Sequence, residues 1–166
     1  MKTTNLGDSG YVIYQASTAK VDDEDKVFLQ KLFRSQEQQY RFNFPYQCGT
    51  GCDLPHAAFD NMHEVTPGKD FVVMGTDGLF DNLYDHDIEM CLKPGIKDKG
   101  NQIYELTNPD GTAECIARKA YGLSKDRRYF SPFSKGARES GRRHIGGKSD
   151  DITVIVSHIV STDKQN

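Results

Sequence analysis

Two apolar runs stand out from a chain whose hydrophobic and polar positions otherwise mix. Residues 71–76 and 152–160 are rich in β-branched residues and are bounded by turn-forming or charged residues, so we expect a strand in each. Residues 5–15 open with a turn-like Gly-Asp-Ser-Gly and continue as a third β-rich run. The charged connector 18–26 is expected to form the solvated end of a hairpin, and the return run 27–35 fits either a strand or a short helix.

Apolar residues at helical spacing indicate two helices in the second half of the chain. One is expected to begin near Asp85 or Asp87, and the other to run from about residue 113 to residue 123. Residues 93–112 between them are expected to form a long loop. The order strand, strand, loop, strand, helix, helix, strand has no strict alternation, which indicates an α+β domain with helices on one face of an antiparallel sheet.

Alternating aromatic residues mark one part of the otherwise irregular region 36–63. Tyr40, Phe42, Phe44 and Tyr46 have the period of two that is typical of a strand. We interpret them as one face of a strand packed in the core.

Composition and charge are those of an ordinary soluble domain. The chain has 166 residues, 36% of them hydrophobic and 27% charged, which supports one packed core, so we treat 1–166 as a single domain. A net charge of −3 gives no overall attraction for nucleic acid or an anionic membrane. No run approaches the roughly 18 apolar residues of a membrane span, and the first residues lack the apolar core of a signal peptide. We therefore expect an intracellular protein, cytoplasmic or organellar.

The four cysteines are expected to be reduced in such a compartment. The pair in "CGTGC", Cys48 and Cys52, has His56 and His63 nearby and could hold zinc. The two-residue gap usual in zinc sites is missing, so we favour ordinary thiols in a loop or in the core.

Carboxylates stand at the ends of the two clearest strands. Asp77 follows the run 71–76, while Asp150 and Asp151 precede the last strand. If the two strands are antiparallel neighbours, these carboxylates converge, which is costly unless a cation lies between them. Hard oxygen ligands suit Mg²⁺ or Mn²⁺. Asp81 lies one helical turn beyond Asp77, and Gly78 lets the chain turn close to a metal. The alternative is an ordinary Asp-Gly turn and a helix cap.

Basic residues precede Asp150 in the sequence. Arg142, Arg143 and Lys148 are candidates for docking phosphate, and the alternative, which we favour, is a solvated basic loop. The patch is too small and too poor in aromatic residues for nucleic-acid binding. His144 is a candidate proton donor to a leaving group, although a surface loop histidine is favoured.

Three ordered motifs carry a family resemblance. "VVMGTDGLFDNL", "GGKSDDITVIV" and "NLGDSGYVIY" together resemble the metal-dependent Ser/Thr protein phosphatases of the PP2C (PPM) family. "RSQEQQYRFNFPYQ" and "SPFS" resemble its PTC7-like branch. The resemblance runs through most of residues 5–160. It implies a β-sandwich flanked by helices, with two metals at one end.

The resemblance also implies roles for individual residues. Asp77 and Asp150 match metal ligands, and Asp81 matches a ligand of a third, weaker metal. Asp8 and Ser9 match a structural turn near the site, Asp151 a position beside the ligands, and no catalytic residue is implied beyond the metal site. The implied activity is hydrolysis of phosphoserine or phosphothreonine in a phosphoprotein, with Mn²⁺ or Mg²⁺ activating a water for in-line attack on phosphorus.

Only the C-terminal part of that domain is matched. The family's Glu-Asp pair, its Asp-Gly-x-Gly-Gly motif and its phosphate-gripping arginine have no counterpart here. We therefore expect an incomplete sandwich with bare apolar surface, which suggests self-association. Two alternatives to an enzyme stay open: a non-catalytic PP2C-like fragment or pseudophosphatase that acts in protein interaction, and a simple Mg²⁺- or Ca²⁺-binding domain.

Overall fold

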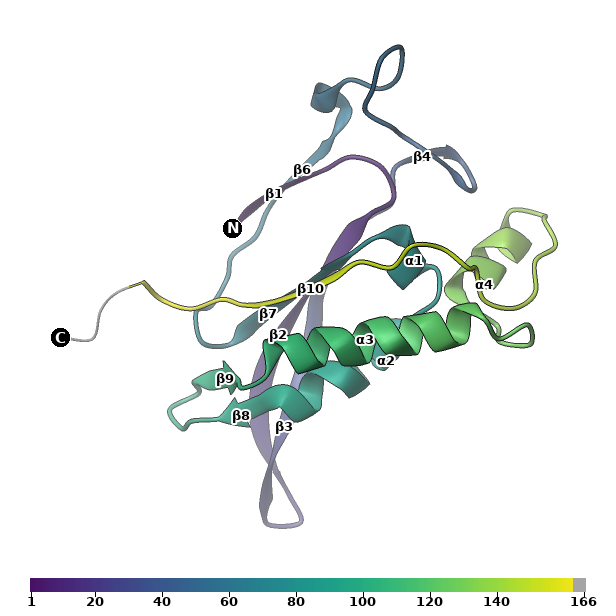
Figure 1. The fold of residues 1–166 in the computed structure, drawn as a ribbon. Coiled ribbons are helices and arrows are strands. Elements are labelled where there is room, and N and C mark those ends of the chain that lie inside the picture. Colours follow the sequence, from purple (N-terminus) through teal and green to yellow (C-terminus); the bar gives the residue numbers. More distant parts are fainter. Residues whose placement is uncertain (163–166) are drawn as a thin grey trace.

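A computed structural model describes residues 1–162 and has the mixed α+β architecture expected from the sequence (Figure 1). Its central sheet has four antiparallel strands in the order β10-β7-β2-β3. These strands are β10 (Val154–His158), β7 (Asp70–Gly75), β2 (Gly10–Val21) and β3 (Glu24–Arg34). The runs 5–15, 71–76 and 152–160, in each of which a strand was predicted, therefore all contribute to one sheet.

The ambiguous run 27–35 is a strand, because β2 and β3 form a long hairpin. The hairpin turns at Asp22 and Asp23, whose φ angles of 53° and 63° are in the left-handed region that Asp tolerates better than most residues. The charged connector is therefore the end of a hairpin, as predicted. A further pair of strands, β1 (Lys2–Asn5) and β6 (Phe59–Met62), was not predicted.

Helices α2 (Asp85–Leu92) and α3 (Pro109–Ser124) cover one face of this sheet (Figure 1). Helix α1 (Asp77–Phe80) follows β7, and α4 (Pro132–Glu139) lies beyond the end of the sheet. Two 3₁₀ turns, η1 (Pro55–Ala57) and η2 (Lys93–Gly95), complete the helical elements between Met1 and Thr162. Helix α2 begins where the sequence predicted. Between Met1 and Thr162 there is no helix whose length and apolar character would let it cross a membrane.

Capping residues explain the two differences among the helices. Helix α3 begins before residue 113 because Pro109 fits the first turn and the Asn108 side chain accepts a hydrogen bond from the Gly111 amide. Helix α4 was not predicted, and it lies in the Gly- and Arg-rich stretch of residues 129–151. It is built in the same way, with Pro132 in its first turn and the Ser131 hydroxyl accepting from the Ser134 amide.

The prediction of a long loop at 93–112 is wrong for the middle of that range, which contains two strands. Strands β8 (Ile96–Asp98) and β9 (Tyr104–Leu106) form a short hairpin there. Asn101 and Gln102 make its turn with φ angles of 54° and 60°. Three-residue strands are too short to produce a clear alternating pattern.

The core strand predicted for the alternating aromatics is also wrong. Asn43, with a φ of 56°, reverses the chain between β4 (Gln39–Arg41) and β5 (Phe44–Pro45). Tyr40 and Phe44 are 60% and 51% exposed. A turn inside the run means that its alternation does not follow the face of one strand.

Two of the four cysteines form a disulfide, which contradicts the prediction that all are reduced. Cys91 in α2 and Cys115 in α3 are joined across the packed helices, with their Cα atoms 5.7 Å apart. The pairing follows from helix packing that the spacing of the two cysteines does not reveal. Cys48 and Cys52 are free and exposed, in line with the favoured interpretation as loop thiols.

The main core lies between the sheet and the helices. Val12, Tyr14 and Val73 from the sheet pack there against Ile88 of α2 and Ile116 of α3. A smaller cluster, Tyr11, Ile13 and Val72, lies on the opposite face. Leu79 and Phe80 of α1 also belong to this core, so packing fixes α1 at the end of β7, where Asp77 and Asp81 lie.

Candidate functional site

Strand pairing brings the acidic residues of two distant motifs together. β10 runs antiparallel to β7 with Val154 opposite Gly75, so the segment before β10 lies beside the segment after β7. Asp77 begins α1, and the Asp81 amide donates to the Asp77 carbonyl at 2.7 Å, one turn further on. Asp77, Asp81 and Asp150, hereafter the carboxylate cluster, therefore converge as the sequence predicted.

A lysine ammonium lies at the centre of the carboxylate cluster. Lys148 Nζ is 2.7 Å from Asp77 Oδ2, 2.7 Å from Asp81 Oδ2 and 3.1 Å from Asp150 Oδ2. The Lys148 side chain is only 18% exposed. The three carboxylates and one ammonium therefore form a partly buried network with an excess of negative charge.

Asp81 and Asp150 differ in pKa because they are buried to different extents. Burial raises the pKa of Asp81 to about 6, against the opposing effect of the hydrogen bond from Lys148. Burial also acts on Asp150, but the Asp151 amide and Lys148 outweigh it and hold its pKa below the ordinary value. The side chains are 14% and 37% exposed respectively, which accounts for the difference. The pKa of Lys148 is raised, because its carboxylate partners outweigh its burial.

Asp8 and Glu37 add further negative charge nearby. Burial, and then the charge of Asp77, raise the pKa of Asp8, which follows the turn at Gly7 with its φ of 92°. The pKa of Glu37 is also raised, by burial first and against the effect of Arg34. Glu37 is nevertheless exposed as a residue, so we give it a smaller part in the charge balance than Asp81. Glu37 was not predicted from the sequence.

The turn residues hold the segment that carries Asp150 against α1. The Thr76 hydroxyl donates to the Asp151 carbonyl at 2.9 Å and accepts from the Thr153 amide at 3.1 Å. The Gly78 amide donates to Asp77 Oδ1 at 2.8 Å, which orients that carboxylate. Ser9 is a turn residue whose carbonyl accepts a hydrogen bond from the Asn5 side chain.

Asn82 is a second residue near the carboxylate cluster that was not predicted from the sequence. It is fully buried, and its side-chain amide donates to the carbonyls of Gly78 and Lys148 at 2.9 and 2.8 Å. Its carbonyl oxygen accepts from the Lys148 amide at 2.9 Å. Asn82 therefore fixes the backbone of Lys148 next to α1. Its place directly after Asp81 in "GLFDNL" was the available signal, but an Asn at a helix end is more often a cap.

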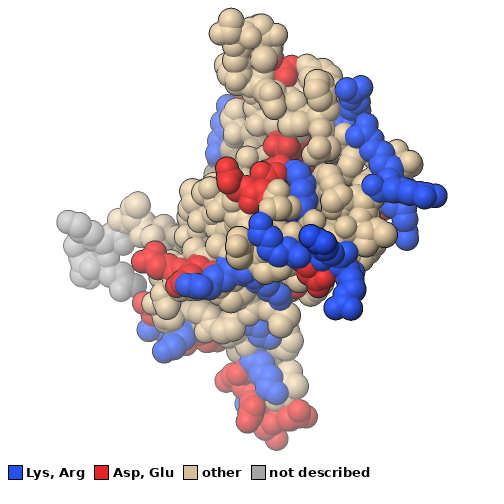
Figure 2. Space-filling model, turned by 45° about the vertical axis from the view of Figure 1, so that its right-hand side comes forward, with Lys and Arg blue, Asp and Glu red and all other residues tan. Residues whose placement is uncertain are grey.

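The remaining basic residues lie further out. Arg142 and Arg143 are exposed, and the Arg142 guanidinium lies 5.7 Å from the ring centroid of Phe42. His144 is partly buried, its Nε2 lies 3.3 Å from the Gly147 carbonyl, and its ring meets Phe133 edge-on. Figure 2 shows acidic and basic side chains side by side across this part of the surface. Phosphate docking by Arg142, Arg143 and Lys148 stays a prediction.

The donor chemistry of the carboxylate cluster fits a hard divalent cation, but its centre is filled. Carboxylate oxygens that converge on one point are the ligands that Mg²⁺ and Mn²⁺ prefer. Within residues 1–162, however, no group of three or more Asp, Glu, His or Cys side chains is arranged to hold a metal ion. The ammonium of Lys148 takes the central position instead.

Curated proteins similar to this chain are named as phosphatases. A probable protein phosphatase 2C 55 of Arabidopsis thaliana is 36% identical over 97% of this chain and 31% of its own length. The protein phosphatase PTC7 homologs of Xenopus laevis and Homo sapiens are 37% and 36% identical over 95% of this chain, which corresponds to 50% and 48% of their lengths. The chain thus spans between about a third and a half of these relatives, and it matches their C-terminal part.

A solved structure with the same fold is also named as a phosphatase. The photosystem II phosphatase PBCP superposes with a TM-score of 0.71 at 26% identity, over 95% of this chain and 58% of that one. No model of a protein family matches the chain.

Proposed function

This chain is a relative of the PP2C protein phosphatases, the PTC7 homologs among them, and on that premise we propose that it forms part of a metal-dependent phosphoserine and phosphothreonine phosphatase. The observation that carries the proposal is the convergence of Asp77, Asp81 and Asp150 on one cationic centre. They come from two of the motifs that resemble the family.

The carboxylate cluster would hold the divalent cation. Asp77 is oriented by the Gly78 amide and Asp150 by the Asp151 amide, each at a carboxylate oxygen other than the one that faces Lys148. Such preorganised carboxylates need little rearrangement to bind a cation. A bound Mn²⁺ or Mg²⁺ supplies Lewis-acid charge to the phosphoryl oxygens and acidifies an attacking water.

A hollow beside Asp150 is an argument for a peptide substrate. It measures about 510 Å³ and is lined by Ala117, Arg118 and Tyr121 of α3 and by Asp150, Asp151 and Ile152. Apolar, aromatic and cationic side chains next to the carboxylate cluster suit the residues that flank a phosphorylated side chain. The exposed Arg142 and Arg143 add positive charge for the phosphate itself.

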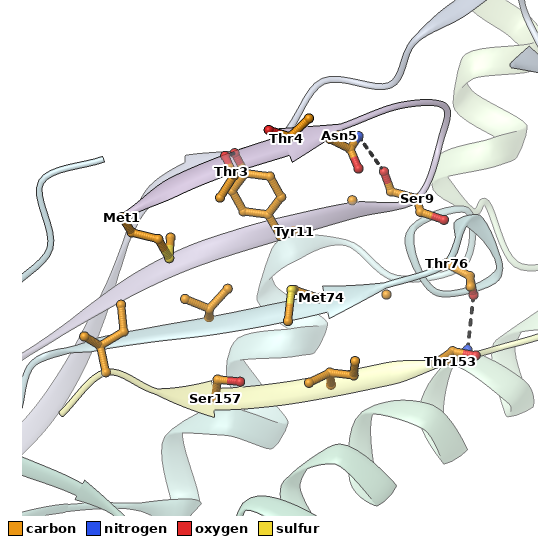
Figure 3. Close-up of a pocket in the computed structure, with 15 residues that line it drawn as sticks. Met1, Thr3, Thr4, Asn5, Ser9, Tyr11, Met74, Thr76, Thr153 and Ser157 are labelled. Carbon is orange, nitrogen blue, oxygen red and sulfur yellow. Dashed lines mark hydrogen bonds between the residues drawn. The ribbon is translucent and has the colours of Figure 1, made fainter. Parts of the chain in front are cut away.

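The alternative function is a non-catalytic phosphatase-like module that acts in protein interaction. One observation favours it: the centre of the carboxylate cluster holds the Lys148 ammonium. A groove of about 550 Å³ on the sheet face opposite the helices provides a candidate contact surface (Figure 3). Met74 and Ile155, 37% and 50% exposed, line it. Self-association through this face stays a prediction.

Replacing Asp77, a proposed ligand of the divalent cation, tests the proposed activity. We expect the chain to release phosphate from a phosphothreonine peptide in a Mn²⁺-dependent manner, and Asp77→Asn to lower that rate by at least about 100-fold, because an electrostatic group at the reacting centre is lost. The measurement is initial rates of phosphate release at fixed pH with and without EDTA. Asp110→Asn, at an exposed position in the first turn of α3, is the matched control and is expected to keep the full rate.

The outcomes separate the two functions. A rate in Asp77→Asn equal to that of the unchanged chain would contradict the proposed site. Absence of Mn²⁺-dependent release from the unchanged chain, together with measurable Mn²⁺ binding, would favour the non-catalytic module.

A further inference from the structure

Lys148 is held at the carboxylate cluster by its backbone. Asn82 binds both its amide and its carbonyl. The preceding Gly147 lies so close to α3 that a Cβ there would be 2.1 Å from the Leu123 carbonyl oxygen. The base of the side chain is therefore fixed, whereas the ammonium sits at the end of a flexible four-carbon stem.

The ammonium has three carboxylate neighbours in this position. It donates hydrogen bonds to Asp77 Oδ2 and Asp81 Oδ2 at 2.7 Å and forms an ion pair with Asp150 Oδ2 at 3.1 Å. It also lies 5.1 Å from the ring centroid of Phe133, which adds a cation–π contact. The arrangement is that of a counter-ion inside an acidic cluster rather than of a surface lysine.

A divalent cation bound by the same oxygens cannot share this position. Mg²⁺ and related cations lie about 2 Å from their oxygen ligands. Because Asp77 Oδ2 and Asp81 Oδ2 both contact the ammonium at 2.7 Å, a metal ligated by them would lie against Nζ. Repulsion between the two cations makes the two arrangements mutually exclusive.

We propose that Lys148 is a built-in counter-ion that competes with the divalent cation for Asp77, Asp81 and Asp150, and that it must swing out before the metal binds. The inference rests on the metal site of the proposed function. Two consequences follow. The Lys148 ammonium keeps the carboxylate cluster assembled when no metal is bound, and its competition lowers the affinity of the chain for a divalent cation.

The competition is tested by measuring Mn²⁺ binding directly. We expect Lys148→Met to bind Mn²⁺ about tenfold more tightly than the unchanged chain, because the competing charge is gone. The readout is the dissociation constant from the electron paramagnetic resonance signal of free Mn²⁺ at constant pH and ionic strength. Lys125→Met removes the same charge from a neighbouring lysine that bonds Ser149 and not the cluster, and should change the constant by less than about twofold.

A second measurement covers the case in which Lys148→Met folds poorly. In EDTA its thermal midpoint should fall below that of the unchanged chain, because three carboxylates lose their counter-ion, and Mn²⁺ should restore it. Lys148→Gln, which keeps a hydrogen-bond donor without the charge, should also bind Mn²⁺ more tightly.

The outcomes distinguish this inference from the proposed function. If Lys148→Met and Lys148→Gln bind Mn²⁺ no more tightly than the unchanged chain while Asp77→Asn weakens binding, the metal site stands and the competition is wrong. If Asp77→Asn leaves Mn²⁺ binding unchanged, or if no variant binds Mn²⁺, both the metal site and the competition are wrong.

Discussion

Gly78→Ala is expected to lower the free energy of unfolding by about 3 kcal/mol and to weaken Mn²⁺ binding. A Cβ on Gly78 would lie 2.3 Å from the carbonyl oxygen of Asp151 and 3.0 Å from its carbonyl carbon. These are backbone atoms, so relief requires the segment that carries Asp150 to move away from α1. That movement also breaks the hydrogen bond from Thr76 to the Asp151 carbonyl. Urea unfolding followed by circular dichroism measures the loss.

Gly122→Ala is the matched control for this prediction. Gly122 lies inside α3, where a Cβ would meet nothing within 4 Å. Alanine there is expected to raise the free energy of unfolding by up to about 1 kcal/mol through helix propensity. Equal effects of the two substitutions would show that Gly78 and Asp151 are not in close contact in solution.

Asn82→Leu is expected to cost about 3 kcal/mol of stability, although leucine has nearly the same size. The change removes the buried hydrogen-bond partner of three backbone groups: the carbonyl of Gly78 and the amide and carbonyl of Lys148. Each such group costs roughly 1 kcal/mol or more. Because Asn82 fixes Lys148 beside α1, the variant should also show altered Mn²⁺ affinity. Urea unfolding and Mn²⁺ titration measure the two effects.

Asn5→Leu serves as the comparison for Asn82→Leu. The Asn5 side chain donates one exposed hydrogen bond to the Ser9 carbonyl, so its loss should cost less than about 1 kcal/mol. If the Asn82→Leu chain is as stable as the Asn5→Leu chain, the hydrogen bonds from the Asn82 side chain to the Lys148 backbone do not stabilise the fold.

The sequence predicted those parts of the fold whose hydrophobic pattern is long and unbroken. β7 and β10 are such runs, and their antiparallel pairing, which the sequence left as a condition, is present in the structure. The pattern failed where a turn interrupts it, as at Asn43 between two exposed aromatics, or where the elements are very short, as in the hairpin at residues 96–106. The Cys91–Cys115 disulfide was missed because it depends on how α2 packs on α3.

The part of the candidate site that lies at the ends of strands could be predicted from the sequence. Asp77 and Asp150 stand at adjacent strand ends, and Asp81 follows by helical spacing, so their convergence could be inferred. The position of the Lys148 ammonium could not, because a long flexible side chain has no periodic signal. Asn82 was missed for a related reason: its three partners are backbone groups brought together only by the folded chain.

The proposed function requires that Asp77, Asp81 and Asp150 bind a divalent cation. Anomalous diffraction from crystals of this chain grown with Mn²⁺ would locate that cation. We predict an anomalous peak about 2 Å from carboxylate oxygens of Asp77 and Asp150, with the Lys148 ammonium displaced from the cluster. A structure at saturating Mn²⁺ with no peak there and with Lys148 still in contact with all three carboxylates would show that these residues do not form the metal site.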